Sequence, residues 1–186
     1  MTRAGGGCAA AIAALRDPPS SLASSIEEML GARPHLILVS SSWVPAPAWA
    51  SPPLPPGSEV LLRRTVYRVG EIGVSWHMAA IEPTTFGSAR IRDLQEGRSS
   101  LAHLLAGSGV EKRDVRVDMI DGTGRGQDGP VVLAAEVVPI AAGAIATRRY
   151  HITIHGAPAG VVVEALPCAT WERMAGVDRS SSGRPG

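Results

Sequence analysis

Six stretches of the chain are rich in β-branched and apolar residues and are bounded by glycine or proline, a pattern typical of β-strands. They are residues 35–40, 60–69, 73–81, 110–119, 145–155 and 160–166. Two further stretches, 21–30 and 99–106, repeat apolar residues at helical spacing behind serines that can cap a first turn. Residues 131–142 fit either a short helix or a strand. The pattern predicts an α+β fold.

The two halves of the chain follow the same order of elements. When the sequence is slid against itself by 86 positions, three residues of the first half coincide with identical residues of the second: Gly57, Arg63 and Gly70 with Gly143, Arg149 and Gly156. In each half a short helix precedes a strand, a connector and a hairpin. We therefore expect a single domain with a six-stranded antiparallel sheet and helices on one face, arising from an internal duplication.

Glycine, proline and polar residues mark the remaining segments. Six prolines between residues 45 and 56 predict a stiff connector. Residues 124–129 formally match GxGxxG, but a proline and two valines follow, so we expect a flexible loop and no dinucleotide site. We expect the domain at residues 20–168, an extension at 1–19 that forms a surface helix or a frayed end, and a disordered tail at 169–186.

Net charge and cysteine content restrict the classes of binding partner and the cellular compartment that we expect. The 186 residues carry a formal charge of +1, so we expect neither nucleic acid nor a membrane surface as a partner. The apolar run near the N-terminus is too short to span a bilayer. Cys8 and Cys168 lie near opposite ends and outside any CxxC pair, which predicts no disulfide framework and favours a reducing cytoplasm. The pattern does not define an oligomeric state.

Two kinds of charged residue stand out against the apolar strands. Glu164 follows three valines, so it is either a strand-end carboxylate in a structural pair or a buried carboxyl with a raised pKa. Arg63 and Arg149 each belong to an Arg-Arg pair, and alternation along a strand turns one member of each pair inward. An inward guanidinium suits bidentate capture of a carboxylate, whereas an outward one is solvated. The histidines lack a third ligand at metal-binding spacing, so we expect no metal site.

These landmarks resemble the chorismate pyruvate-lyase family, the 4-hydroxybenzoate synthases and their relatives, over roughly residues 20–168. LLRRTVYRVG is similar to the family's strand with its substrate-holding arginine, which falls on Arg63. RRYHITIHGAPAGVVVEALP matches the series that ends in the family's active-site Glu, here Glu164. The resemblance also places substrate contacts on Leu101 and Leu22. A further basic residue of the family is missing here, and Arg149, Arg113 or His77 is the candidate to replace it.

The resemblance implies a function as well as a fold. Such enzymes bind a small aromatic or cyclohexadiene carboxylate in a sealed pocket and need neither a metal nor an organic cofactor. We therefore expect a lyase that eliminates pyruvate from chorismate to give 4-hydroxybenzoate, with Arg63 and Glu164 as catalytic residues. Two alternatives stay open: a small-molecule effector-binding module without catalysis, similar to those attached to bacterial transcription regulators, and a biosynthetic enzyme that reuses the pocket for another elimination or ring-forming step.

Overall fold

The computed structural model describes residues 6–16, 21–106, 109–120 and 143–181. Their elements follow in chain order: α1 (Gly6–Arg16), α2 (Leu22–Leu30), β1 (His35–Pro45), the 3-10 helix η1 (Ala48–Ala50), β2 (Glu59–Val69), β3 (Ile72–Ile81), α3 (Pro83–Phe86), α4 (Ser88–Gln95), α5 (Leu101–Leu105), β4 (Val110–Ile120), β5 (Ile145–Ile154), β6 (Ala157–Pro167) and α7 (Cys168–Ser181). The predicted strands and the helices at 21–30 and 99–106 are therefore confirmed within a few residues. The glycine-rich loop and residues 131–142 lie outside the described residues.

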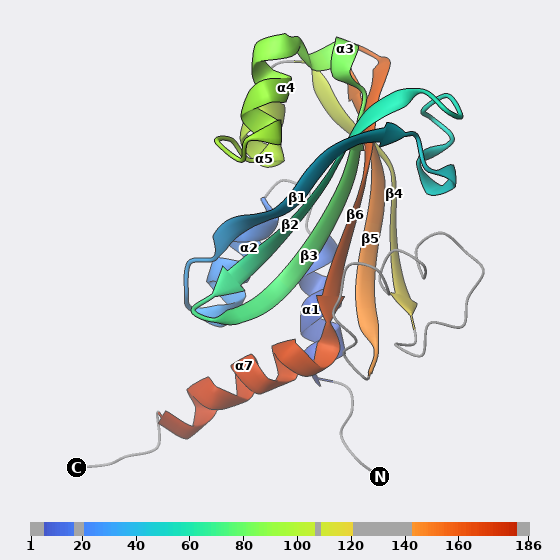
Figure 1. Ribbon diagram of the computed structural model, residues 1–186. Coiled ribbons are helices and arrows are strands. Elements are labelled where there is room, and N and C mark those ends of the chain that lie inside the picture. Colours follow the sequence, from blue (N-terminus) through green and yellow to red (C-terminus); the bar gives the residue numbers. More distant parts are fainter. Residues whose placement is uncertain (1–5, 17–20, 107–108, 121–142, 182–186) are drawn as a thin grey trace.

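The strands form one six-stranded antiparallel sheet, as predicted, and the structure shows that their order is β1-β2-β3-β6-β5-β4 (Figure 1). The tight hairpins β2–β3 and β5–β6 meet at the central pair β3–β6. Corresponding positions of the two hairpins are 85 residues apart: Arg63 pairs with Ala79 in the first, and Arg148 pairs with Glu164 in the second. Both hairpins also shift register beside equivalent residues, Tyr67 and Ile152. This symmetry is what a duplicated helix-strand-hairpin unit produces.

The sheet has two differently covered faces. Helices α1, α2, α4 and α5 lie over one, which we call the helix face (Figure 1). Apolar side chains that alternate along the strands, such as Leu61, Ile152 and Val162, pack there against α4 and α5. The opposite face, which we call the connector face, carries the segment between β1 and β2, whose Ala50 and Leu54 pack on Val60, Ala80 and Val161.

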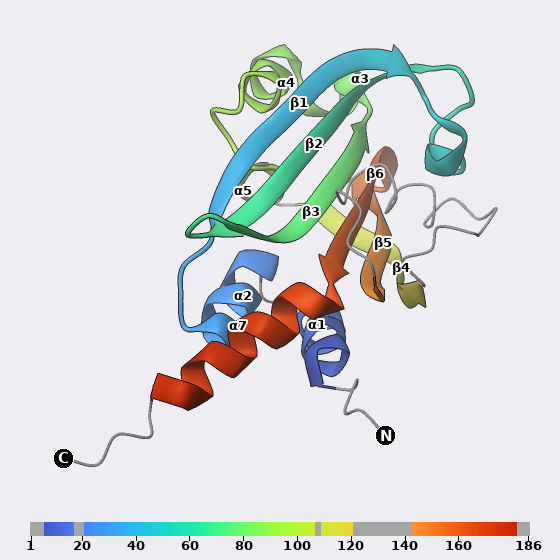
Figure 2. The ribbon, with the colours of Figure 1, turned by 60° about the horizontal axis from the view of Figure 1, so that its bottom comes forward.

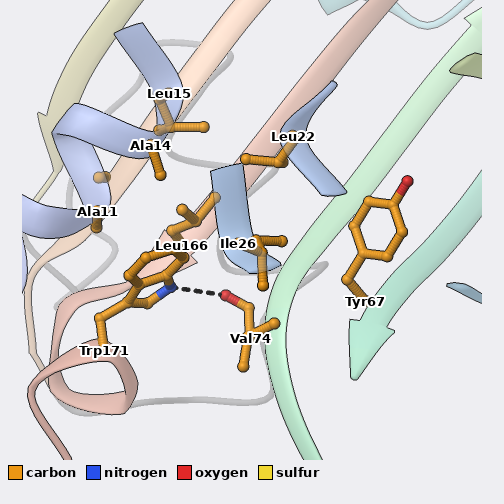
Figure 3. Packing of buried hydrophobic residues seen from close by; sticks show 10 residues of the cluster. Ala11, Ala14, Leu15, Leu22, Ile26, Tyr67, Val74, Leu166 and Trp171 are labelled. Atoms are coloured by element: carbon orange, nitrogen blue, oxygen red, sulfur yellow. Dashed lines mark hydrogen bonds between the residues drawn. The ribbon is translucent and has the colours of Figure 1, made fainter. Parts of the chain in front are cut away.

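A second part of the core joins both ends of the chain to the sheet. Ala11, Ala14 and Leu15 of α1 pack around Leu166 and Trp171, and Trp171 Nε1 donates a 2.9 Å hydrogen bond to the carbonyl of Val74 (Figure 3). Helix α7 runs beneath the sheet past α1 and α2 (Figure 2). Burial of these apolar residues contributes to holding both terminal helices against the domain.

The termini differ from the sequence-based expectation in three ways. The N-terminal segment forms the helix α1 and is not a frayed end, but one face of that helix is part of the core, with Ala11 and Leu15 fully buried. Residues 168–181 form α7 where a disordered tail was expected, and residues 182–186 lie outside the described residues. Cys8 and Cys168 form a disulfide across 160 positions of sequence. The cysteine argument for a reducing compartment is therefore wrong, and the cytoplasmic location stays a prediction without it.

None of the described helices combines the length and the apolar composition that crossing a bilayer requires.

Candidate binding site

A cavity of about 240 Å³ lies on the helix face between the sheet and the first turns of α2 and α5. Side chains from both halves of the domain line it. The strands contribute Leu36, Arg63, Thr65, Tyr67, His77, Ala79, Lys112, Arg148, Tyr150, Val162 and Glu164, and the helices contribute Ser21, Leu22, Ser100, Leu101, Ala102, Leu105 and Ala106. Exposed lining residues, among them Ser21, Ala102 and Lys112, show that the cavity opens to solvent. The part of the chain that the structure describes therefore does not seal the pocket, in contrast to what the resemblance implied.

The most strongly bonded group in the cavity is an ion pair between neighbouring strands. Arg148 Nε donates to Glu164 Oε2 at 2.5 Å, and the hydroxyl of Tyr150 donates to Glu164 Oε1 at 3.3 Å. Arg148 and Glu164 are each only 4% exposed. The two residues meet because they are directly paired across β5 and β6 and both side chains point to the helix face.

The ion pair determines the charge states of its members. Burial alone would raise the pKa of Glu164, but the attraction of Arg148 outweighs it and lowers that pKa below its ordinary value. Burial likewise opposes the charge of Arg148, and Glu164 more than compensates, so the pKa of Arg148 is raised. Burial and the neighbouring Glu164 raise the pKa of Tyr150 well above 10. Glu164 is therefore ionised at neutral pH, and the alternative of a carboxyl with a raised pKa is wrong.

Arg148 makes one further contact and has one unused donor. Its Nη1 donates a 2.6 Å hydrogen bond to the carbonyl of Leu15, in the last turn of α1. Carbonyls at a helix C-terminus lack a partner within the helix, and a cation there also interacts favourably with the helix dipole. The buried Nη2 atom has no hydrogen-bond partner among the described residues. A buried N–H without an acceptor is costly, so a ligand oxygen that reached it would be stabilised.

Arg63 contributes a second buried guanidinium, which donates its hydrogen bonds to backbone carbonyls. Its Nε donates to the carbonyl of Leu94 and its Nη2 to that of Ser99, both at 3.1 Å. Arg63 thereby ties β2 to the end of α4 and to the segment that leads into α5. Burial lowers its pKa, yet a guanidinium stays protonated throughout the physiological range.

His77 and Lys112 complete the polar lining. Burial lowers the pKa of His77 to about 4 despite the attraction of Glu164, so the imidazole is neutral at neutral pH. Its Nε2 lies 2.9 Å from Ser75 Oγ, and its Nδ1 lies 3.8 Å from Glu164 Oε1, beyond hydrogen-bond distance. Lys112, which is exposed, places Nζ 5.0 Å from the centre of the Tyr150 ring. The lining therefore contains three cations and one carboxylate.

The structure brings together five of the seven candidate residues: His77 and four others line the cavity, whereas the exposed Arg113, paired with Glu111, does not. Arg63, Glu164, Leu22 and Leu101 all line the cavity. Arg149 does not, because it points to the connector face, where Nη2 donates to the carbonyls of Trp49 at 3.0 Å and Pro52 at 3.3 Å.

Sequence reasoning chose the wrong member of the second Arg-Arg pair and overlooked the role of Arg148. The alternation between strand faces requires one inward member but does not say which. Lys112 and Tyr150 were also missed, and no sequence signal distinguishes them from ordinary strand residues.

The comparisons with known proteins identify the fold. No protein-family model matches the sequence, and neither does any curated protein. The C-terminal domain of PhnF is 17% identical, with a TM-score of 0.53 over 74% of this chain and 84% of that one. PhnF from Mycobacterium smegmatis is 13% identical, with a TM-score of 0.54 over 80% of this chain and 64% of that one. The ligand-binding domain of a Bordetella bronchiseptica protein assigned to the GntR-family transcriptional regulators is 14% identical, with a TM-score of 0.50 over 73% and 84%.

These likenesses confirm the predicted chorismate lyase-like fold, and they correct the predicted activity. Proteins with this fold include one assigned as a regulator and the ligand-binding domain of another, so the expectation of a lyase that releases pyruvate and 4-hydroxybenzoate is wrong. The site agrees with this correction. Glu164 is held as a carboxylate by Arg148, and Arg63 is bonded to two backbone carbonyls.

Proposed function

We propose that this domain is a ligand-binding module whose cavity takes a small organic anion with an apolar body. The proposal depends above all on one observation: among the described residues, Arg63, Arg148 and Lys112 line a single cavity with one carboxylate, Glu164. An uncompensated cationic site in partly desolvated surroundings favours an anionic group, either carboxylate or phosphate. The fold's occurrence as a ligand-binding domain in regulators supports an effector role, without catalysis.

The apolar lining supports the second half of the proposal. Leu22, Leu101 and Leu105 come from the helices, and Ala79 and Val162 lie on the sheet beneath them. An aliphatic or aromatic ligand body packed among these side chains would be removed from water. The polar end would then face the cationic cluster, with Arg148 Nη2 as the donor that currently lacks an acceptor.

A set of three probes of similar shape tests the charge requirement. Phenyl phosphate, benzoate and the neutral benzamide would be titrated into the protein, with binding followed by NMR chemical shifts of the cavity residues. We expect affinity to fall in that order, because the cavity has a net excess of two positive charges, three cations against one carboxylate. Equal binding of benzoate and benzamide, or no binding of either anion, would contradict the proposal.

Neighbouring arginines on opposite faces of β5 provide a matched pair of variants. Arg148→Gln removes a charge-assisted donor from the cavity and should weaken phenyl phosphate binding about 10-fold to 100-fold. Arg149→Gln removes the same charge from the connector face and should leave affinity nearly unchanged. A similar loss in both variants would indicate a general effect of net charge and would overturn the assignment of the cavity.

A further inference from the structure

The disulfide joins two segments that are remote in sequence, α1 and the start of α7. Cys8 lies in the first half of α1, and Cys168 begins α7 directly after β6. Cys168 is held to the sheet, since its backbone N–H donates to the carbonyl of Ala144 at 3.0 Å. The disulfide therefore anchors α1 to a fixed point of the sheet.

Helix α1 in turn contacts the most strongly bonded cation of the cavity. The carbonyl of Leu15 accepts the 2.6 Å hydrogen bond from Arg148 Nη1, while Nε of the same guanidinium binds Glu164. The orientation of Arg148 is thus set from two sides, by β6 and by α1.

Without the disulfide, noncovalent packing alone would hold α1 against the rest of the domain. The buried residues of α1 are two alanines and one leucine, Ala11, Ala14 and Leu15, and Ala10 and Ile12 pack beside them while only partly buried. The helix has 11 residues, a length at which an isolated helix is marginal in water. Cys8 is only partly buried, whereas Cys168 is 4% exposed, so Cys8 is the more accessible member of the disulfide.

We propose that the Cys8–Cys168 disulfide is a redox switch for the cavity: its reduction releases α1, removes the Leu15 acceptor from Arg148 and weakens anion binding. The reductant is a dithiol. Its thiolate attacks Cys8 Sγ, the Sγ–Sγ bond breaks, and the sulfur of Cys168 leaves as a thiolate. The second thiol of the reductant then displaces Cys8, so that two electrons and two protons convert the disulfide into two cysteine thiols, and the dithiol becomes a cyclic disulfide.

The test compares the oxidised protein with the same protein reduced by dithiothreitol, using three readouts. On reduction we expect amide hydrogen exchange in α1 to accelerate at least about tenfold while β3 and β6 stay protected. We expect the Nε–H NMR signal of Arg148, which reports the Glu164 bond, to shift or broaden. Affinity for phenyl phosphate should fall about fivefold or more, since a mobile guanidinium loses more entropy on binding.

A double variant controls for effects of the reductant itself. Cys8→Ser/Cys168→Ser should resemble the reduced protein and should not respond to dithiothreitol. The switch is overturned if α1 exchange is unchanged on reduction, or if α1 loosens while the Arg148 signal stays the same. Only the affinity readout rests on the proposed function: if the oxidised protein binds no phenyl phosphate, that function fails, and hydrogen exchange and the Arg148 signal still decide the switch.

Discussion

The two halves of the sheet place an arginine at the same position and use it differently. Arg63 of the first hairpin and Arg148 of the second both point to the helix face and into the same cavity. Across the strand, Arg63 faces Ala79, whereas Arg148 faces Glu164. Arg63 instead binds two backbone carbonyls and fixes α4 and α5. A shared backbone geometry therefore positions both guanidiniums, and the residue opposite each decides its role.

Other equivalent positions show the same asymmetry. Tyr150 in the second half corresponds to Thr65 in the first, and Lys112, paired with Ile152, corresponds to Leu36, paired with Tyr67. The first half thus lines the cavity with smaller or apolar groups, and the second half concentrates the charged ones. Both halves nevertheless contribute positive charge, Arg63 from the first and Lys112 and Arg148 from the second, where Glu164 offsets one of the two.

Replacing each arginine by glutamine should distinguish most clearly between the ion pair of Arg148 and the carbonyl hydrogen bonds of Arg63. Arg148→Gln leaves the Glu164 carboxylate buried without its cation, and breaking such a pair costs about 3–5 kcal/mol of unfolding free energy. Arg63→Gln loses hydrogen bonds to carbonyls and should cost about 1–3 kcal/mol. Urea denaturation of both variants measures the two losses under the same conditions.

A double variant checks the cause of the larger loss. Arg148→Gln/Glu164→Gln removes both charges and should recover part of the stability, because no unpaired ion remains. If Arg63→Gln destabilises the protein as much as Arg148→Gln, the two arginines are equivalent and the comparison above does not hold.

The pH dependence of stability should reveal a second asymmetric position. His77 occupies the place that Val162 holds in the second half, and burial lowers its pKa from 6.5 to about 4. Between these two pKa values His77 is protonated in the unfolded chain and neutral in the folded protein. Stability should therefore fall as pH decreases from 6.5 to 4, by about 3 kcal/mol from this residue.

The variant His77→Gln isolates that contribution. It keeps a side chain able to hydrogen-bond with Ser75 but removes the titration, so its stability should change less over the same pH interval. Burial also lowers the pKa of His151, on the connector face, and the difference between wild type and variant cancels this second effect. Parallel stability curves for the two proteins would show that His77 is not the buried neutral group described here.

The sequence predicts the strands and the inward Arg63 correctly. For the second hairpin it predicts Arg149 as the inward arginine, whereas the structure shows the preceding residue, Arg148, in the cavity. The comparison of identical residues aligned Gly70 with Gly156, whereas the hairpin registers align Gly70 with His155. Both Gly70 and His155 adopt a left-handed backbone, with φ of 57° and 49°. Glycine is the usual residue for this conformation, so matching glycines shifted the register by one and exchanged the two faces of the sheet.

Other features depend on contacts that no local pattern reports. A strand can be predicted from the sequence because its apolar residues follow a local pattern. The pairing of Cys8 with Cys168 depends instead on how α1 and α7 dock in the folded protein. The same holds for Leu15, whose backbone carbonyl rather than its side chain contacts Arg148. Arg63 and Glu164 could be chosen from the sequence because charged residues are conspicuous in apolar strands.

The smallest test compares the helix caps that the two halves share. Ser21 accepts a hydrogen bond from the backbone N–H of Ser24 at the start of α2, and Ser100 accepts one from the N–H of His103 at the start of α5. Each serine also lines the cavity, so it both caps a helix and forms part of the cavity wall. Replacing either by alanine should cost about 1 kcal/mol of unfolding free energy, because one N–H at the helix start loses its acceptor.

Their effects on binding should differ although their effects on stability are similar. Ser100 adjoins Ser99, whose carbonyl Arg63 holds, so fraying of α5 in Ser100→Ala would disturb the apolar wall at Leu101. Ser21 precedes α2, whose Leu22 and Ile26 stay buried in the terminal core, so Ser21→Ala should alter phenyl phosphate binding less. Measuring both quantities for each variant tests this directly: a larger binding loss for Ser21→Ala would mean that the first half forms the more sensitive wall.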